Sequence, residues 1–121
     1  MNTPARFPQR VFGSGDEPDV RFTLANERTF LAWIRTALAL IAAGVALEAL
    51  SLPIQPTLRL IASLILLVLG LLLPILAWLT WGLVERALRH STPLPGSPIT
   101  LPLAVGIAAV SALLIAGTVL R

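Results

Sequence analysis

The sequence predicts an all-α membrane protein with three transmembrane helices. Its 121 residues are 56% hydrophobic and only 12% charged, and the mean hydropathy is +0.87. That composition is too apolar for a soluble domain of this size. The apolar residues also gather into three long segments separated by proline-rich breaks, which is the pattern of a chain that crosses a bilayer repeatedly.

The three predicted spans are about residues 29–50, 58–84 and 99–120. Each reaches the roughly 20 residues that a helix needs to cross the hydrocarbon core. Helices are expected because lipid offers the backbone no hydrogen-bond partner, and these segments lack the alternation of barrel strands. The breaks at residues 51–57 and 91–98 carry prolines that end helices. The second span is long enough to cross with tilt.

Residues 1–21 differ from the rest of the chain. They contain three prolines, two glycines and scattered charges, so they are predicted to form a disordered cytoplasmic tail before a three-helix domain at residues 22–121. The arginines set the expected orientation. Six lie on the side of the tail and the second loop, and two lie on the other: Arg6, Arg10, Arg21, Arg28, Arg86 and Arg89 against Arg59 and Arg121. The positive-inside rule then places the N-terminus in the cytoplasm and the C-terminus outside, in a multi-pass protein of the cell membrane.

Three charges stand where the first span begins, at Glu27, Arg28 and Arg35. The two arginines are seven residues apart, so they share one helix face about 10 Å apart along the axis. Thr23 or Asn26 is expected to cap this helix. One interpretation is an anion-attracting mouth formed by several copies. The other is that Arg35 extends its long side chain to headgroup phosphates.

The remaining charges favour structural roles. Glu48 and Arg59 flank the first loop and are expected to form an ion pair. Arg86 and Arg89 follow the second span, where they serve as topology signals or join the other arginines in binding an anion or a lipid headgroup.

Two further patterns concern helix shape and packing. Pro74 removes the hydrogen bond to the carbonyl of Gly70, which predicts a kink that is either static or a hinge. The first and third spans are rich in alanine, which favours close helix contacts within one chain or between chains. In the third span the alanines recur every four residues: Ala104, Ala108, Ala112 and Ala116.

Several function classes are excluded. The chain has no cysteine, its one histidine is His90, and its aspartates, Asp16 and Asp19, fall in the tail. Neither catalytic constellations nor metal-ligand spacings occur, so we expect no enzyme, no metal and no cofactor. The high pI reflects few acids in an apolar chain, so no nucleic-acid partner is expected.

The run LANERTFLAWIRTALALIAAGVAL, at residues 24–47, resembles the signature of the YidH-like inner-membrane proteins, a domain of unknown function (family 202). That family is similar to the membrane domain of the vacuolar transporter chaperone, in which several three-helix units surround an axis and basic residues help to pass polyphosphate. By motif position, the resemblance implies that Glu27, Arg28 and Arg35 line or brace such a path. For Arg86 and Arg89, which lie outside the matching run, the resemblance implies only an auxiliary role in that path.

Two functional hypotheses follow. In the first, the protein is a homo-oligomeric subunit whose basic cytoplasmic mouth binds or passes anions such as phosphate or polyphosphate. In the second, it is a structural or assembly subunit that anchors phospholipid headgroups and docks a membrane partner. The face beyond Arg35 continues only as alanines, which favours a closed bundle over a conducting one.

Overall fold

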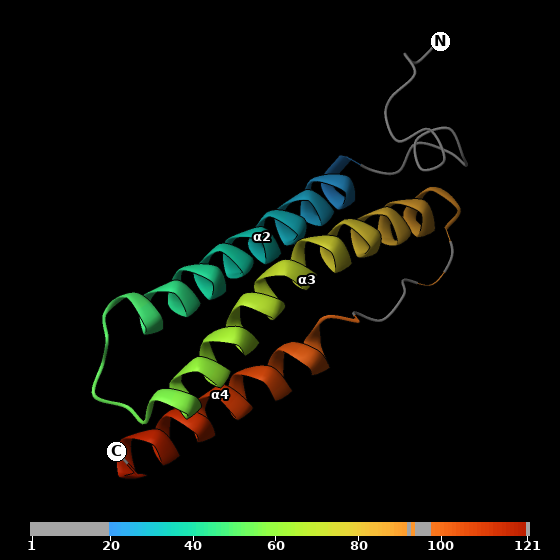
Figure 1. Ribbon diagram of the computed structural model, residues 1–121. Coiled ribbons are helices and arrows are strands. Elements are labelled where there is room, and N and C mark those ends of the chain that lie inside the picture. The colour runs from blue at the N-terminus through green and yellow to red at the C-terminus, as the bar shows by residue number, and fades with distance from the viewer. Residues whose placement is uncertain (1–19, 92, 94–97, 121) are drawn as a thin grey trace.

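The computed structural model describes residues 20–91, 93 and 98–120. These residues form three helices, α2 (Val20–Ala49), α3 (Pro56–Arg89) and α4 (Thr100–Leu120), with no strand in the part described. Each helix is long and apolar enough to cross a membrane. The predicted class is therefore confirmed: the protein is an all-α, multi-pass membrane protein. Successive helices run in opposite directions, so Val20 and Leu120 lie at opposite ends of the molecule (Figure 1).

The first two helices are longer than a bilayer requires. At 1.5 Å per residue, the 30 residues of α2 measure about 45 Å and the 34 residues of α3 about 51 Å, against a hydrocarbon core of about 30 Å. The predicted tail lies outside the described residues up to position 19. Val20 and Arg21, assigned to the tail from the sequence, already belong to α2.

α2 and α3 pack closely in an antiparallel pair. A Cβ added at Gly44 would lie 3.1 Å from the carbonyl oxygen of Ser63, and the Ser63 hydroxyl donates a 2.6 Å hydrogen bond to the carbonyl of Gly44. Farther along, a Cβ at Gly70 would meet Ile41 and would lie 3.2 Å from the carbonyl oxygen of Ala37. Glycines at these two positions therefore allow the backbones to approach.

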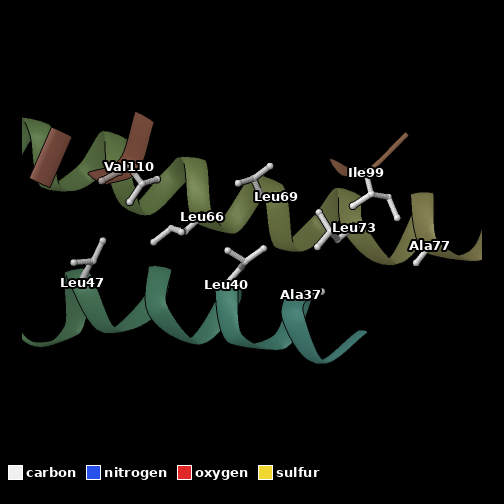
Figure 2. Close-up of a cluster of buried hydrophobic side chains, with 10 residues drawn as sticks. Ala37, Leu40, Leu47, Leu66, Leu69, Leu73, Ala77, Ile99 and Val110 are labelled. Carbon is white, nitrogen blue, oxygen red and sulfur yellow. The ribbon is translucent and has the colours of Figure 1, made fainter. Parts of the chain in front are cut away.

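α4 packs on α3 and on the hairpin before it. A Cβ at Gly106 would meet Leu69, and one at Gly117 would lie 3.5 Å from Leu58. No Cα of α4 lies within 8 Å of a Cα of α2 in the described chain, so α3 is the central helix (Figure 1). Large apolar side chains from all three helices fill the space over α3 (Figure 2), among them Leu40, Leu47, Leu66, Leu73, Ile99 and Val110.

The alanine stripe of α4 does not serve this packing. Ala104, Ala108 and Ala112 are exposed and Ala116 is half-buried, whereas Val110 and Gly117 face α3. The sequence left open whether such alanines contact helices within the chain, and for α4 the contact within the chain uses other residues.

The loop between α2 and α3 is a tight hairpin. Ser51 ends α2 in the left-handed conformation (φ 49°), and the Gln55 side chain caps α3 by accepting a 2.8 Å bond from the Leu58 amide. The backbone N–H of Gln55 donates to the carbonyl of Gly117 at 2.9 Å, and this bond links α4 to the hairpin. Arg59 Nε lies 3.4 Å from Glu48 Oε1, and Arg59 Nη1 donates to a hairpin carbonyl at 2.8 Å.

Candidate functional site

A set of polar residues joins the start of α2 to the end of α3, and Trp81 is at its centre. The Asn26 side-chain amide donates to the Trp81 carbonyl at 3.0 Å, and the Trp81 indole donates to Glu27 Oε1 at 3.0 Å. Asn26 and Trp81 are both buried, at 7% exposure each. Two consecutive residues of α2 therefore bond to one residue of α3, one to its backbone carbonyl and the other to its side chain.

Glu85 lies one turn farther along α3 and is fully buried. Its carboxylate accepts a hydrogen bond from the Thr23 hydroxyl at 3.2 Å and a longer one from the Asn26 amide at 3.5 Å. Arg89, also buried, places Nε 3.9 Å from Glu85 Oε1. A buried carboxylate needs such donors and an opposite charge, because desolvation strongly disfavours an isolated charge. We call Thr23, Asn26, Glu27, Trp81, Glu85 and Arg89 the polar brace.

The brace corrects the expectation of helix caps. Thr23 and Asn26 do not cap α2, because the helix already begins at Val20 and both residues lie inside it. Their side chains instead bond across to α3. Glu27 bonds to the Trp81 indole, so its bracing contact in the structure is to a tryptophan.

The opposite side of α2 carries three arginines. Arg28 and Arg35 are both exposed, and they share one face of the helix, as their spacing predicts. The other side of α2 packs on α3. Arg21 is exposed too and lies seven residues before Arg28, so it continues the same line. We call Arg21, Arg28 and Arg35 the arginine face. It extends about 21 Å along the helix axis.

The other predicted residues lie elsewhere. Arg86 is exposed on α3, but the expectation that Arg89 joins the exposed arginines is not met, because Arg89 is buried beside Glu85. Glu48 and Arg59 form their contact at the far end of the molecule.

The predicted hinge lies within a helix that runs unbroken past Pro74. Gly70 is buried under α2, and its lack of a side chain serves that close contact. A hinge motion at this point stays a prediction.

The helix register gives the depth of each arginine. Asn26 lies beside Trp81 and Gly44 beside Ser63, so extending this register sets Arg35 level with Leu72 and Arg28 level with Leu79. The contacts of α4 with α3, extended in the same way, set Thr100 level with Ile75.

α4 measures about 31 Å, close to the thickness of the hydrocarbon core, so we take the start of α4 as the reference level for depth. Arg35 then lies about 4–5 Å inside the level where α4 begins, and Arg28 about 6 Å outside it. The polar brace also lies outside this level.

A pocket of about 260 Å³ opens between α2 and α3 at the same end. Four aromatic residues line it, Phe22, Phe30, Trp33 and Trp81. Trp81 stacks on Trp78 with ring centroids 5.1 Å apart, and Phe30 meets Trp78 edge-on at 6.3 Å. The wall is therefore apolar and held by aromatic contacts.

Three polar residues, Asn26, Thr29 and Thr80, also line the pocket. Thr80 Oγ1 is buried and has no hydrogen-bond partner among the described residues. Along α3 the lining runs from Ala77 to Leu88, at levels beyond the start of α4. The pocket thus lies past the end of α4.

Sequence reasoning missed the contacts of Trp81 and Glu85 with α2, and it missed Arg21 as the third arginine of the exposed face. A signal for both was present. Asn26 precedes Trp33 by seven residues and Leu40 by fourteen, and these three residues lie on the side of α2 that faces α3. Polar residues on the inner face of an apolar helix need partners, which predicts an acceptor such as Glu85 on the neighbouring helix.

Arg21 precedes Arg28 by seven residues, the same spacing that separates Arg28 from Arg35.

A comparison with family profiles gave one match, to the family described as a domain of unknown function (DUF202), over residues 21–87. Comparison with curated proteins and with solved structures gave no match. The matched range covers more than half of the 121 residues, begins with the arginine face and includes Thr23, Asn26, Trp81 and Glu85 of the brace. The chain therefore belongs to the DUF202 family, whose domain takes up α2 and nearly all of α3 in this three-helix membrane protein.

Proposed function

We propose that this membrane protein is a homo-oligomeric subunit that binds phosphate-bearing anions at its arginine face. The observation that carries the proposal is the exposure of Arg28 and Arg35 on the side of α2 that faces away from α3. The polar brace fixes the opposite side of the same helix, so the arginines are presented by a rigid support. Guanidinium groups suit this role because they bind phosphate in a bidentate geometry.

The balance of charge at this end supports an anionic ligand. At this end, the described residues include two acids, Glu27 and Glu85, and both belong to the brace. They include five arginines: Arg21, Arg28, Arg35, Arg86 and Arg89. Arg35 also lies within the depth marked by α4, where an isolated charge is costly. Phosphate groups, either on lipids or free, would give Arg28 and Arg35 a negatively charged partner.

Exposed small residues support self-association. Ala32, Ala39 and Ala42 follow the arginines along the outward side of α2 and are exposed in the single chain. Small residues let helices of neighbouring copies approach closely in lipid. We place this end in the cytoplasm, because six of the eight counted arginines lie on its side of the membrane.

Anchoring of phospholipid headgroups is the second candidate, and one observation favours it. No Cα of α4 lies within 8 Å of a Cα of α2 in the described chain, so the three helices of a single chain do not close around a path. Beyond Arg35 the outward side of α2 is alanine and leucine, which offers nothing polar to a moving ion. An assembly subunit held at the headgroups needs the arginines but no passage.

The first experiment counts copies in lipid nanodiscs by native mass spectrometry. The proposal expects a ring of three or more copies, and a stable monomer would refute the oligomeric subunit. A second experiment uses the Arg28→Gln/Arg35→Gln variant, with Arg59→Gln at the other end as the control. We expect binding of inorganic phosphate or polyphosphate to fall about tenfold in the first variant alone.

Flux separates the two candidates. Proteoliposomes loaded with phosphate would lose it through the wild type and retain it with the Arg35→Gln variant if the ring conducts. Wild-type vesicles that retain phosphate, while the arginines still bind it, would favour the anchoring role. Equal binding by the double variant and the wild type would refute anion binding at this face altogether.

A further inference from the structure

We infer that the aromatic pocket between α2 and α3 is a binding site for an anionic phospholipid, with the glycerol end of the lipid in the pocket and its phosphate beside Arg21 and Arg28. The inference rests on the proposed binding of phosphate by the arginine face, and it names the source of that phosphate as the surrounding bilayer.

The position of the pocket carries the first step. Nearer the middle of the molecule, both α2 and α4 pack on α3, and Leu73 and Ile99 are almost wholly buried there (Figure 2). α4 begins at Thr100, level with Ile75, whereas α3 continues to Arg89. The pocket lies between α2 and α3 just past the end of α4. With the start of α4 as the edge of the hydrocarbon core, this is the depth of the lipid headgroups.

The lining carries the second step. Phe22, Phe30, Trp33 and Trp81 provide an apolar, aromatic wall, and indole and phenyl rings favour the interfacial zone of a bilayer. The buried Thr80 hydroxyl lacks a hydrogen-bond partner among the described residues. A buried hydroxyl of this kind is costly unless something supplies a partner, and the ester oxygens of a lipid are acceptors of the right type.

Charge complementarity carries the third step. Ala25 lines the pocket from α2 and is exposed. Arg21 precedes it by four residues and Arg28 follows it by three, so both arginines neighbour Ala25 on the helix surface. Neither arginine lines the pocket, but both lie within about one turn of Ala25 on the surface of α2, within the range of a long side chain. Two such guanidinium groups fit a lipid that carries a net negative phosphate, and basic pockets between helices hold anionic headgroups.

Lipid retention tests the inference. The full-length protein, extracted from bilayers of phosphatidylglycerol and phosphatidylcholine, is analysed by native mass spectrometry for bound lipid. We expect about one phosphatidylglycerol per chain in the wild type, and at least a fivefold loss in Ala25→Phe, whose ring would fill the mouth of the pocket. Ala43→Phe, at an exposed position of the same helix away from the pocket, is the matched control and should retain the lipid.

Fluorescence provides a second measurement that needs no pocket variant. In a Trp78→Phe background the remaining tryptophans, Trp33 and Trp81, both line the pocket. Phosphatidylglycerol brominated near the carboxyl end of its chains should quench them about twice as strongly as phosphatidylcholine brominated in the same way. Equal quenching by the two lipids would overturn the inference.

The outcomes also separate this inference from the proposed function. If Ala25→Phe retains phosphatidylglycerol as the wild type does, the pocket does not hold the lipid, although the arginine face would still bind phosphate through Arg28 and Arg35. If the Arg28→Gln/Arg35→Gln variant binds inorganic phosphate and polyphosphate as well as the wild type does, the proposed function fails first. Loss of lipid in Ala25→Phe but not in Ala43→Phe would support the lipid site.

Discussion

Replacing Glu85 with leucine should destabilise the protein more than any other single change in the polar brace. The carboxylate is fully buried and accepts from Thr23 and Asn26, while Arg89 lies 3.9 Å away. The Glu85→Leu variant would leave the guanidinium of Arg89 buried without this counter-charge. It would also remove the acceptor of two donors.

The magnitude follows from these contacts. Two unit charges at this distance attract by about 4 kcal/mol at an effective dielectric constant of about 20, and breaking a buried pair from one side costs about 3–5 kcal/mol. We expect a loss of about 3–4 kcal/mol in the free energy of unfolding for Glu85→Leu. Arg89→Leu should cost less, about 2 kcal/mol, because Thr23 and Asn26 still donate to the carboxylate.

The double variant is the decisive measurement. Without either charge, no ion remains buried, so Glu85→Leu/Arg89→Leu should be about as stable as Arg89→Leu alone. The coupling energy from the cycle is then about 3 kcal/mol. Unfolding by increasing sodium dodecyl sulfate in mixed micelles, followed by the fluorescence of the stacked pair Trp78 and Trp81, gives all four stabilities.

The control for this cycle is Glu48→Leu, because Glu48 is an exposed acid at the far end of the same helical pair and should change stability by less than about 0.5 kcal/mol. Single-variant effects that add to within about 0.5 kcal/mol would refute the reasoning, because residues that share a buried network must couple.

Three further changes test the rest of the fold by the same unfolding assay. Gly44→Leu should cost about 3 kcal/mol, because its side chain would meet a backbone carbonyl of α3. Ala43→Leu, at an exposed position of α2, should cost less than about 0.5 kcal/mol, and similar losses for the two variants would contradict the close packing of the two helices. Ser51→Gly should raise stability by about 0.5–1 kcal/mol, because glycine adopts the left-handed conformation without a Cβ penalty, and a decrease would be inconsistent with the positive φ. Arg59→Ala should cost about 1–1.5 kcal/mol through its lost bond to a hairpin carbonyl, but Glu48→Ala less than about 0.5 kcal/mol, and equal losses would show that the exposed ion pair dominates.

The class of fold was predictable because it depends on composition and length. Long apolar segments in lipid must be helical, and the prolines of the two loops mark where the helices end. The resemblance over residues 24–47 was confirmed by the family match, which extends it to residues 21–87. The start of α2 was predicted too late, because Val20 and Arg21 follow the prolines of the tail and read as part of it.

The site was predictable only in part, because its residues come together through the register of two helices. The spacing of Arg28 and Arg35 gave their common face, but no local pattern tells that Asn26 meets Trp81 across 55 positions of sequence. Arg89 was grouped with the exposed arginines because a charge after an apolar span usually faces water. Its burial depends on Glu85, an acid one turn before it, and on where α2 lies.

The unequal partnership of the three helices bears on how the protein is made. The close backbone contacts of α4 in the described chain are with α3 and the hairpin before it. The α2–α3 pair, in contrast, contains its own brace, its own glycine contacts and its own turn. The family match also stops at residue 87, before α4. The pair can therefore assemble as a hairpin before α4 docks. Biogenesis would then have two separable stages, insertion of a braced hairpin and later docking of a third helix onto a surface that is already formed.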